Sequence, residues 1–189
     1  RRVAPYLQRL GAKVWDPDKV VVVTDHYVPA VDAESAAILR LTRQWVRDNA
    51  VTQFHDMQGI CYVVLQEYGH LRPGMLVVGG DSHSPSGGAV GAFMVGIGAT
   101  EMAGVLVTGE IWLRVPETVR VEWSGALGRG VTAKDIMLYL CRVLGQNNDY
   151  KVIEYAGGAI DGMTMADRFV LCNMSAELGA KTGIIAPNA

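Results

Sequence analysis

Four consecutive valines, Val20 to Val23, constrain the fold of this chain more than any other feature. A continuous β-branched run without polar alternation is typical of a strand buried on both faces, as in a parallel sheet covered by helices. The run ends at Thr24, and residues 33–48 then mix apolar and charged side chains at the spacing of an amphipathic helix. A buried strand followed by such a helix predicts a layered α/β protein.

Composition narrows the classes to which the chain can belong. Its 189 residues, 50% of them hydrophobic, predict one domain or two small domains with a real core. A formal net charge of −2 argues against a nucleic-acid partner. No apolar run reaches about 18 residues, so no membrane span is expected. The three separated cysteines, Cys61, Cys141 and Cys172, favour a reducing, cytoplasmic compartment.

Further strands and helices are expected to alternate along the chain. Apolar and β-branched patterns predict strands at 53–56, 75–78, 118–123 and 151–155, and the start of another at 184. Helices are expected at 89–108, 132–144 and 165–179, the second of them opened by a capping box and the last ended by Gly179. Residues 61–68 fit a helix or a strand, and we favour the helix. We place a domain boundary near residue 117, which gives domains 1–117 and 118–189.

Two aspartate–histidine motifs follow predicted strands. Asp25-His26 comes after the valine run, and Asp81-Ser82-His83 lies in the glycine-rich segment 79–88 after the strand at 75–78. Ligands bind at the carboxyl ends of strands in α/β sheets. A carboxylate beside an imidazole raises the imidazole pKa and fixes its tautomer, which favours general acid catalysis near neutral pH. The alternative is a histidine that is merely hydrogen-bonded within a loop.

Two further features allow both a functional and a structural interpretation. A helix after Gly87-Gly88 would present N–H groups to a substrate carboxylate, with Ser82 as an added donor, or the glycines would serve close packing only. Asn173 and Glu177 are four positions apart on a predicted helix and would share one face. They would orient a water or a hydroxyl, or lie on a solvated helix face.

Other cofactors receive little support from the motifs. A zinc site would need the convergence of His26, His55, Asp56, Asp81 and His83, and no H-x-x-x-H or H-E-x-x-H spacing favours it. No G-x-G-x-x-G or Walker motif is present, so a nucleotide is not indicated. His70 precedes a predicted turn and is expected at the surface.

Seven motifs in order resemble the aconitase superfamily, with most similarity to the large subunits of 3-isopropylmalate dehydratase and homoaconitase. The resemblance runs from about Lys19 to Asn188 and implies an α/β/α aconitase-like fold, here incomplete and corresponding to the N-terminal part of the large subunit. The motifs are Val23-Thr24-Asp25-His26, Gln58-Gly59-Ile60-Cys61, Leu71-Arg72-Pro73-Gly74-Met75, Gly80-Asp81-Ser82-His83-Ser84, the segment 95–101, Thr132-Ala133-Lys134-Asp135 and the segment 172–180.

The resemblance implies an iron–sulfur hydro-lyase or isomerase. Such an enzyme moves water between adjacent carbons of a hydroxy di- or tricarboxylic acid, here one like 3-isopropylmalate in amino-acid biosynthesis. One iron of a [4Fe–4S] cluster would act as a Lewis acid on the substrate hydroxyl, which is otherwise a poor leaving group. A small swivelling subunit or domain is the implied partner, because the family's serine base and substrate-binding arginines lie there.

The family roles carry over to named residues of this chain. Asp25 and His26 would form the acid pair that protonates the departing hydroxyl. Asp81 and His83 would line the pocket on the cluster side, and Ser82 would bind a substrate carboxylate. By the same resemblance, the pair Asn173 and Glu177 would position the iron-bound oxygen near His83.

The chain departs from the family pattern at one position of a motif and in its cysteines. Tyr62 stands where the family's Gly-Ile-x-His motif has the histidine that pairs with the aspartate equivalent to Asp81. A phenol titrates near pH 10 and cannot replace that acid, but it can hydrogen-bond to Asp81 and is kept as a substrate-binding residue. The three cysteines do not match the cluster ligands, which we expect beyond the end of a chain that is itself a fragment. A catalytically silent homologue acting as a binding or assembly subunit is therefore the alternative.

Overall fold

The structure is a computed structural model that describes residues 2–187, so Asn188, the end of the resemblance, lies outside the described residues. The chain divides into two compact units. The first unit contains Arg1–His70 and Gly98–Trp112, and the second contains Leu71–Ile97 and Leu113–Ala189. Packing therefore groups residues 71–97 with the C-terminal part of the chain. The domain boundary near residue 117 stays a prediction.

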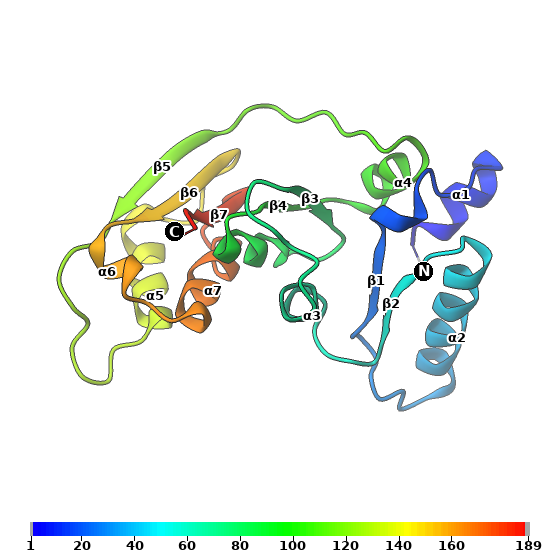
Figure 1. The fold of residues 1–189 in the computed structure, drawn as a ribbon, viewed down its shortest axis with the longest axis horizontal. Coiled ribbons are helices and arrows are strands. Elements are labelled where there is room, and N and C mark those ends of the chain that lie inside the picture. Colours follow the sequence, from blue (N-terminus) through cyan, green and yellow to red (C-terminus); the bar gives the residue numbers. More distant parts are fainter. Residues whose placement is uncertain (1, 188–189) are drawn as a thin grey trace. The chain divides into compact units, whose positions relative to one another are not determined.

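The first unit is built around a short parallel pair of strands, β1 (Val21–Thr24) and β2 (Gln53–Asp56). Figure 1 shows α2 alongside these strands. The predicted helix at 33–48 and the predicted strand at 53–56 are thus confirmed. The helices of this unit are α1 (Ala4–Leu10), α2 (Ala33–Asp48), α3 (Cys61–Glu67) and α4 (Ala99–Thr108), with a 3-10 turn at Pro17–Lys19.

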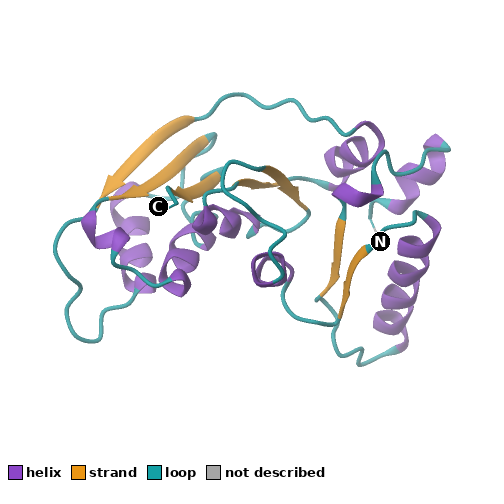
Figure 2. Ribbon diagram, in the orientation of Figure 1, coloured by secondary structure: helices purple, strands orange, loops and turns teal. Residues whose placement is uncertain are grey.

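The second unit contains two parallel sheets, which Figure 2 shows in orange. One pairs β3 (Leu76–Gly79) with β4 (Phe93–Gly96), and the other has the order β5-β6-β7. The remaining elements are the strands β5 (Glu117–Glu122), β6 (Lys151–Ala156) and β7 (Thr182–Ile185), the helices α5 (Ala133–Leu144), α6 (Gly158–Asp161) and α7 (Met165–Asn173), and the 3-10 helix η2 (Ser84–Val90). Parallel strands connected by helices agree with the predicted α/β class.

Helices α5 and α7 cover one face of the β5-β6-β7 sheet in Figure 1 and enclose the main core. Met137 from α5, Ile153 from β6 and Leu171 from α7 are all fully buried. Burial of a side chain of this size contributes about 1.5–3 kcal/mol. The capping box predicted at the start of α5 forms, since Asp135 accepts a hydrogen bond from the backbone N–H of Thr132 at 2.8 Å.

The helix predicted over residues 89–108 is confirmed for 99–108 and wrong for 89–98. The segment instead holds the end of η2, the strand β4 and only then the helix α4, which begins at Ala99. Gly91 has φ +76° and ends η2 in the left-handed region, which glycine adopts at little cost. Phe93 to Gly96 then pair with β3 in parallel register. Small apolar residues fit a buried strand as well as a helix, so periodicity alone misassigned them.

The anion-binding helix expected after Gly87-Gly88 is also wrong, because those glycines lie inside the buried helix η2. A Cβ on Gly88 would overlap the carbonyl oxygen of Gly183 in β7. A Cβ on Gly87 would lie 2.7 Å from the sulfur of Met94 in β4. The two glycines therefore let η2 pack directly on the neighbouring strands, which is the packing alternative weighed for them.

The helix predicted over residues 165–179 is shorter than expected. Helix α7 ends at Asn173, and residues 174–179 form consecutive turns closed by bonds such as Glu177 N–H to the Met174 carbonyl at 3.1 Å. Gly179, the predicted stop, has φ +74° and ends these turns instead. Asn173 and Glu177 consequently do not share a helix face.

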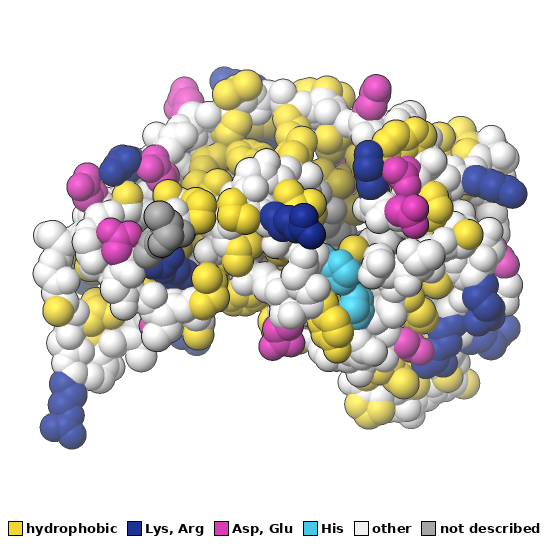
Figure 3. All heavy atoms as spheres, viewed as in Figure 1, with side chains coloured by type: hydrophobic (Ala, Val, Ile, Leu, Met, Phe, Trp, Pro, Cys, Tyr) yellow, Lys and Arg dark blue, Asp and Glu magenta, His cyan; other side chains and the backbone are white. Residues whose placement is uncertain are grey.

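Figure 3 shows acidic and basic side chains scattered over one face, with a group of Lys and Arg side chains at the lower right, where Figure 1 places α2. Among residues 2–187 no helix is both long enough and apolar enough to cross a membrane.

Candidate functional site

The glycine-rich loop that follows β3 is shaped mainly by hydrogen bonds to its own backbone. Asp81 Oδ1 accepts a hydrogen bond from the backbone N–H of His83 at 2.7 Å. The Asp81 carbonyl in turn accepts from the hydroxyl of Ser84 at 2.7 Å and from its N–H at 3.2 Å. These bonds fix the turn, and they hold the carboxylate of Asp81 against the backbone of His83.

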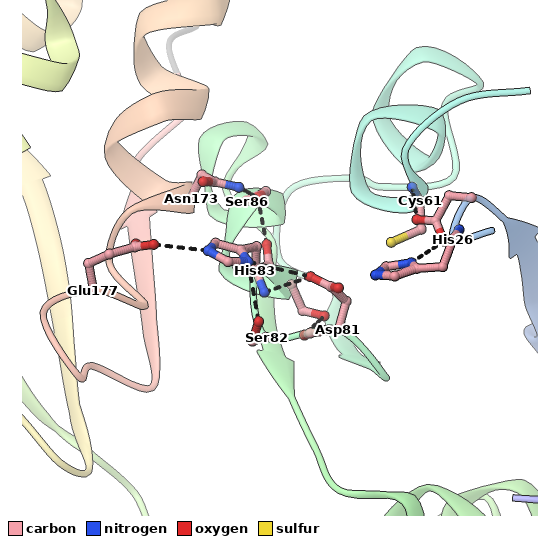
Figure 4. A network of polar contacts seen from close by, with 10 residues as sticks. His26, Cys61, Asp81, Ser82, His83, Ser86, Asn173 and Glu177 are labelled. Atoms are coloured by element: carbon pink, nitrogen blue, oxygen red, sulfur yellow. Dashed lines mark hydrogen bonds and ion pairs between the residues drawn. The ribbon is translucent and has the colours of Figure 1, made fainter. Parts of the chain in front are cut away.

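The His83 imidazole binds a carboxylate from a distant segment. Its Nε2 lies 3.0 Å from Oε1 of Glu177, and its Nδ1 lies 3.2 Å from Oγ of Ser82 (Figure 4). The carboxylate of Asp81 is farther away, at 3.7 Å from Nδ1. Glu177 is therefore the main ring partner, and a carboxylate there fixes the tautomer of His83 with the proton on Nε2.

Asn173 also reaches this loop. Its Nδ2 donates to Oγ of Ser86 at 2.8 Å, and that hydroxyl donates to the carbonyl of His83 at 2.6 Å. Figure 4 shows Asn173 and Glu177 approaching the loop from neighbouring parts of the chain. The structure thus brings the predicted pair to the motif of His83, although not by the shared helix face that the sequence indicated.

A cavity of about 380 Å³ opens beside the loop in the second unit. Asp81 and Ser82 line it together with Lys181 and the backbone at Gly80. The volume falls within the range of small-molecule sites. The loop therefore presents a hydroxyl and a carboxylate to a space that a small organic acid can enter.

In the first unit, Asp25 makes a direct pair with the next residue. Its Oδ1 accepts from both the backbone N–H and the ring Nδ1 of His26, each at 2.7 Å. Its Oδ2 accepts from the backbone N–H of Cys61 at 2.8 Å, at the start of α3 (Figure 4). The side chain of Asp25 is 13% exposed and that of His26 is 71% exposed. The pair therefore has a partly buried carboxylate and a largely exposed imidazole.

The electrostatics of Asp25 favour the charged carboxylate. Burial acts to raise its pKa, but hydrogen bonds from the His26 ring and the Cys61 backbone outweigh burial, and the pKa lies below its ordinary value. An ionised Asp25 accepts the Nδ1 proton of His26. A second cavity, of about 530 Å³, is lined by Asp25, His26, Tyr27 and Thr42.

Tyr62 is the second residue of α3, in the first unit, and is partly buried. Its predicted hydrogen bond to Asp81 stays a prediction.

Of the residues weighed for a zinc site, Asp56 already has partners within the first unit. The carboxylate of Asp56 binds Thr24 and Arg43, each at 2.7 Å, and Arg43 holds the pKa of Asp56 below its ordinary value. Within the described range 2–187, no three His, Cys, Asp or Glu side chains are grouped as metal ligands.

The three cysteines do not fit the ligand set of a [4Fe–4S] cluster. They lie in α3, α5 and α7, and Cys172 is fully buried in the core. Burial raises the pKa of the Cys172 and Cys141 thiols, whereas a cluster ligand must be a thiolate. For this reason the mechanism proposed below uses only side chains of the described residues.

Two contacts of this region were not indicated by sequence patterns. The backbone N–H of Cys61 donates to the carboxylate of Asp25. His70 was expected at the surface, but its Nε2 lies 2.7 Å from Nε2 of the buried His55. Both contacts join residues far apart in the sequence. Neither has a local periodicity or spacing that would reveal it.

Comparison with known proteins gives one family. The aconitase family (aconitate hydratase) matches residues 3–189. Similar proteins include large subunit 1 of 3-isopropylmalate dehydratase from Methanopyrus kandleri, 46% identical over 185 residues, which are 96% of this chain and 44% of that protein.

Two further relatives have comparable similarity. A probable methanogen homoaconitase large subunit from Methanosarcina mazei is 45% identical over 93% of this chain and 46% of its own length. The 3-isopropylmalate dehydratase large subunit from Syntrophus aciditrophicus is 41% identical over 94% of this chain and 43% of its own length. The chain thus spans less than half the length of these curated relatives.

Proposed function

The chain belongs to the aconitase family, and from this premise we propose that it is part of a hydro-lyase or isomerase. The substrate class is a hydroxy di- or tricarboxylic acid similar to 3-isopropylmalate, in keeping with the names of the relatives. The observation that carries the proposal is the 3.0 Å contact between the imidazole of His83 and Glu177, 94 positions away. A surface loop without a role in binding or catalysis would not need a carboxylate from a distant segment to orient its histidine ring.

Dehydration of a hydroxy acid breaks a C–O bond and removes a proton from the adjacent carbon, so it needs an acid and a base. His26 is the proposed acid. The ionised Asp25 would stabilise the imidazolium form, and the ring, which is 71% exposed, would donate its Nε2 proton to the departing hydroxyl. General acid–base catalysis of this kind contributes about 100- to 10,000-fold.

The loop after β3 is the proposed binding wall. Ser82 would donate its hydroxyl to a substrate carboxylate, and Asp81 would line the same cavity. Glu177 would hold His83 in one tautomer, and Asn173 would fix the loop through Ser86. Together these contacts would orient the hydroxyl that leaves and returns.

The family further implies a [4Fe–4S] cluster, a small swivelling subunit or domain, a cytoplasmic location and a role in amino-acid biosynthesis. These belong to the proposal. A bound cluster would supply Lewis-acid assistance to the leaving hydroxyl. Because the described residues do not fit its ligand set, no step of the mechanism above depends on it.

The test is turnover by the full-length protein, loaded with cluster under anaerobic conditions and mixed with its small partner. We expect dehydration of 3-isopropylmalate or a related hydroxy acid, detected as the unsaturated product. The matched control is His83→Ala prepared in the same way. Absence of turnover on a panel of 2- and 3-hydroxy acids, with the cluster present by absorption spectroscopy, would contradict the proposal.

A second candidate is a catalytically silent homologue that serves as a binding or assembly subunit. Tyr62, at the position of a family histidine, favours it. Tyr62→His distinguishes the two candidates. A large gain in turnover from an inactive parent would indicate a site that has lost its activity, whereas no gain, with substrate binding retained, would support the silent role.

A further inference from the structure

His55 and His70 form a histidine pair in the first unit that the proposed chemistry does not use. Their Nε2 atoms lie 2.7 Å apart, and the rings meet edge to face with centroids 5.0 Å apart. The ring of Tyr68 packs on His55 at 4.4 Å. His55 is only 8% exposed. A buried contact this short is a hydrogen bond between two ring nitrogens.

The neighbouring amide determines how many protons the pair carries. Nδ1 of His55 lies 2.9 Å from Oε1 of Gln58, which can only accept, so Nδ1 carries a proton. In a neutral His55, Nε2 is then a bare acceptor, and Nε2–H of His70 donates to it. When both imidazoles are protonated, two donors face each other and the bond cannot exist. The pair therefore holds together with at most one added proton.

Among residues 2–187, the hydrogen bonds and ring contacts of the pair involve no carboxylate. The rings contact each other, Tyr68 and Gln58. Asp56, the next residue of β2, points to the opposite face of the strand, where it binds Arg43 and Thr24. Burial, and then the charge of His55, lower the pKa of His70. A neutral His70 that donates its Nε2–H to His55 is therefore favoured above the ordinary histidine pKa of about 6.5.

The pair closes the segment that carries α3. His55 lies in β2 and His70 lies just past α3, and between them the backbone passes through left-handed residues at Met57 (φ +58°) and Gly59 (φ +140°). A non-glycine residue at such a φ persists only when its surroundings hold it. At the start of α3, the N–H of Cys61 donates to Asp25. The pair thus joins the segment before α3 to the segment after it, and the first N–H of α3 anchors the carboxylate of Asp25.

We propose that His55 and His70 are positioning residues, and we call their shared hydrogen bond the brace. The brace holds α3 in place and, through the Cys61 N–H, the Asp25–His26 pair. Uptake of a second proton by the two histidines breaks it. Asp25 would lose its Oδ2 partner in the released state and no longer hold His26 in one orientation. The effect on turnover rests on the proposed function, whereas the brace itself does not.

The direct test is hydrogen exchange of residues 57–70 in the full-length protein between pH 8 and pH 5, corrected for intrinsic exchange. In wild type we expect a several-fold rise in exchange as the pH falls below about 6.5. His70→Gln keeps a donor facing His55 but cannot take up the second proton, so its exchange should stay nearly flat. Tyr139→Phe, at an exposed position in the second unit, is the matched control and should follow wild type.

Two outcomes would overturn the brace. One is a flat profile in wild type, or the same rise in His70→Gln as in wild type. The other is stoichiometric Zn²⁺ binding that protects residues 57–70 and is lost in His70→Gln, which would make the pair a metal site. Neither readout requires turnover, so an inactive protein contradicts the proposed function and leaves this measurement intact.

Turnover then tests the positioning role. The acidic limb of the kcat–pH profile should move to lower pH in His70→Gln while KM at pH 8 stays within about twofold of wild type, since the variant touches no substrate group. A purely structural effect would lower kcat equally at all pH values. An acidic limb that does not move would contradict the link from the histidine pair to Asp25 and His26.

Discussion

The two aspartate–histidine motifs look alike in the sequence and are connected differently in the two units. Asp25 binds the ring of the adjacent His26 directly, at 2.7 Å, and leaves that ring largely exposed. Asp81 instead binds the backbone N–H of His83, whose ring pairs with Glu177 at 3.0 Å. The first motif presents a largely exposed imidazole on a partly buried carboxylate. The second holds its imidazole between a hydroxyl and a distant carboxylate.

The spacing within each motif explains part of this difference. A carboxylate two positions before a residue readily accepts its backbone N–H, which closes a turn, and Asp81 is used in this way. The ring of His83 is then left to find a partner elsewhere. One motif is therefore suited to delivering a proton, and the other to orienting a bound group. The following predictions test this division of roles.

The largest expected effect is on turnover by His83→Ala. Loss of the imidazole should lower kcat by more than about 100-fold, because misplacing the group that reacts costs on this scale. Steady-state kinetics of the full-length enzyme measures it. Glu177→Gln, which keeps a hydrogen-bond acceptor, should lose less. If Glu177→Gln were as inactive as His83→Ala, the carboxylate would have a role beyond orienting the ring.

Asp25→Asn should lower kcat by about 100-fold, because a neutral amide no longer stabilises the imidazolium of His26. KM should change little, since the exposed ring is expected to deliver a proton rather than to bind substrate. The pH profile of kcat is the diagnostic measurement, and its basic limb should move to lower pH. A rise in KM with unchanged kcat would assign the first motif to substrate binding instead.

Leu171→Ala should reduce the free energy of unfolding by about 2–5 kcal/mol, because it leaves a cavity in the core of the second unit. Leu171 is fully buried, whereas Leu138 on α5 is 54% exposed. Leu138→Ala is the matched control and should change stability by less than about 0.5 kcal/mol. Denaturant unfolding measures both. Equal losses would show that the core does not lie between α7 and the sheet.

The smallest expected effect is the pH dependence contributed by Asp25. Its pKa lies below the ordinary value of 3.8, so its contribution to stability is complete above that value and is lost as the pH falls through the lowered pKa. The difference in denaturant midpoint between wild type and Asp25→Asn should therefore be present at pH 7 and shrink in strong acid. A difference that persisted unchanged in acid would mean that Asp25 does not stabilise the fold as a carboxylate.

Local patterns predicted many elements well. The helix at 33–48 and the capping box at Thr132 follow from residue spacing and side-chain chemistry that act within a few positions. The error over residues 89–98 has a physical cause. Small apolar residues such as those of β4 fit either a strand or a helix, and the choice depends on the neighbouring strand with which they pair.

Sequence patterns alone predicted the α/β class, the family and the two strand ends at which Asp25 and Asp81 lie. Only the tertiary structure decided the partners of the imidazoles, which are Glu177 for His83 and His55 for His70. The difference arises from the separation along the sequence over which each kind of interaction acts. Periodicity, caps and turns act within a few residues, whereas these contacts join positions 94 and 15 apart and form only when strands, turns and helices have packed.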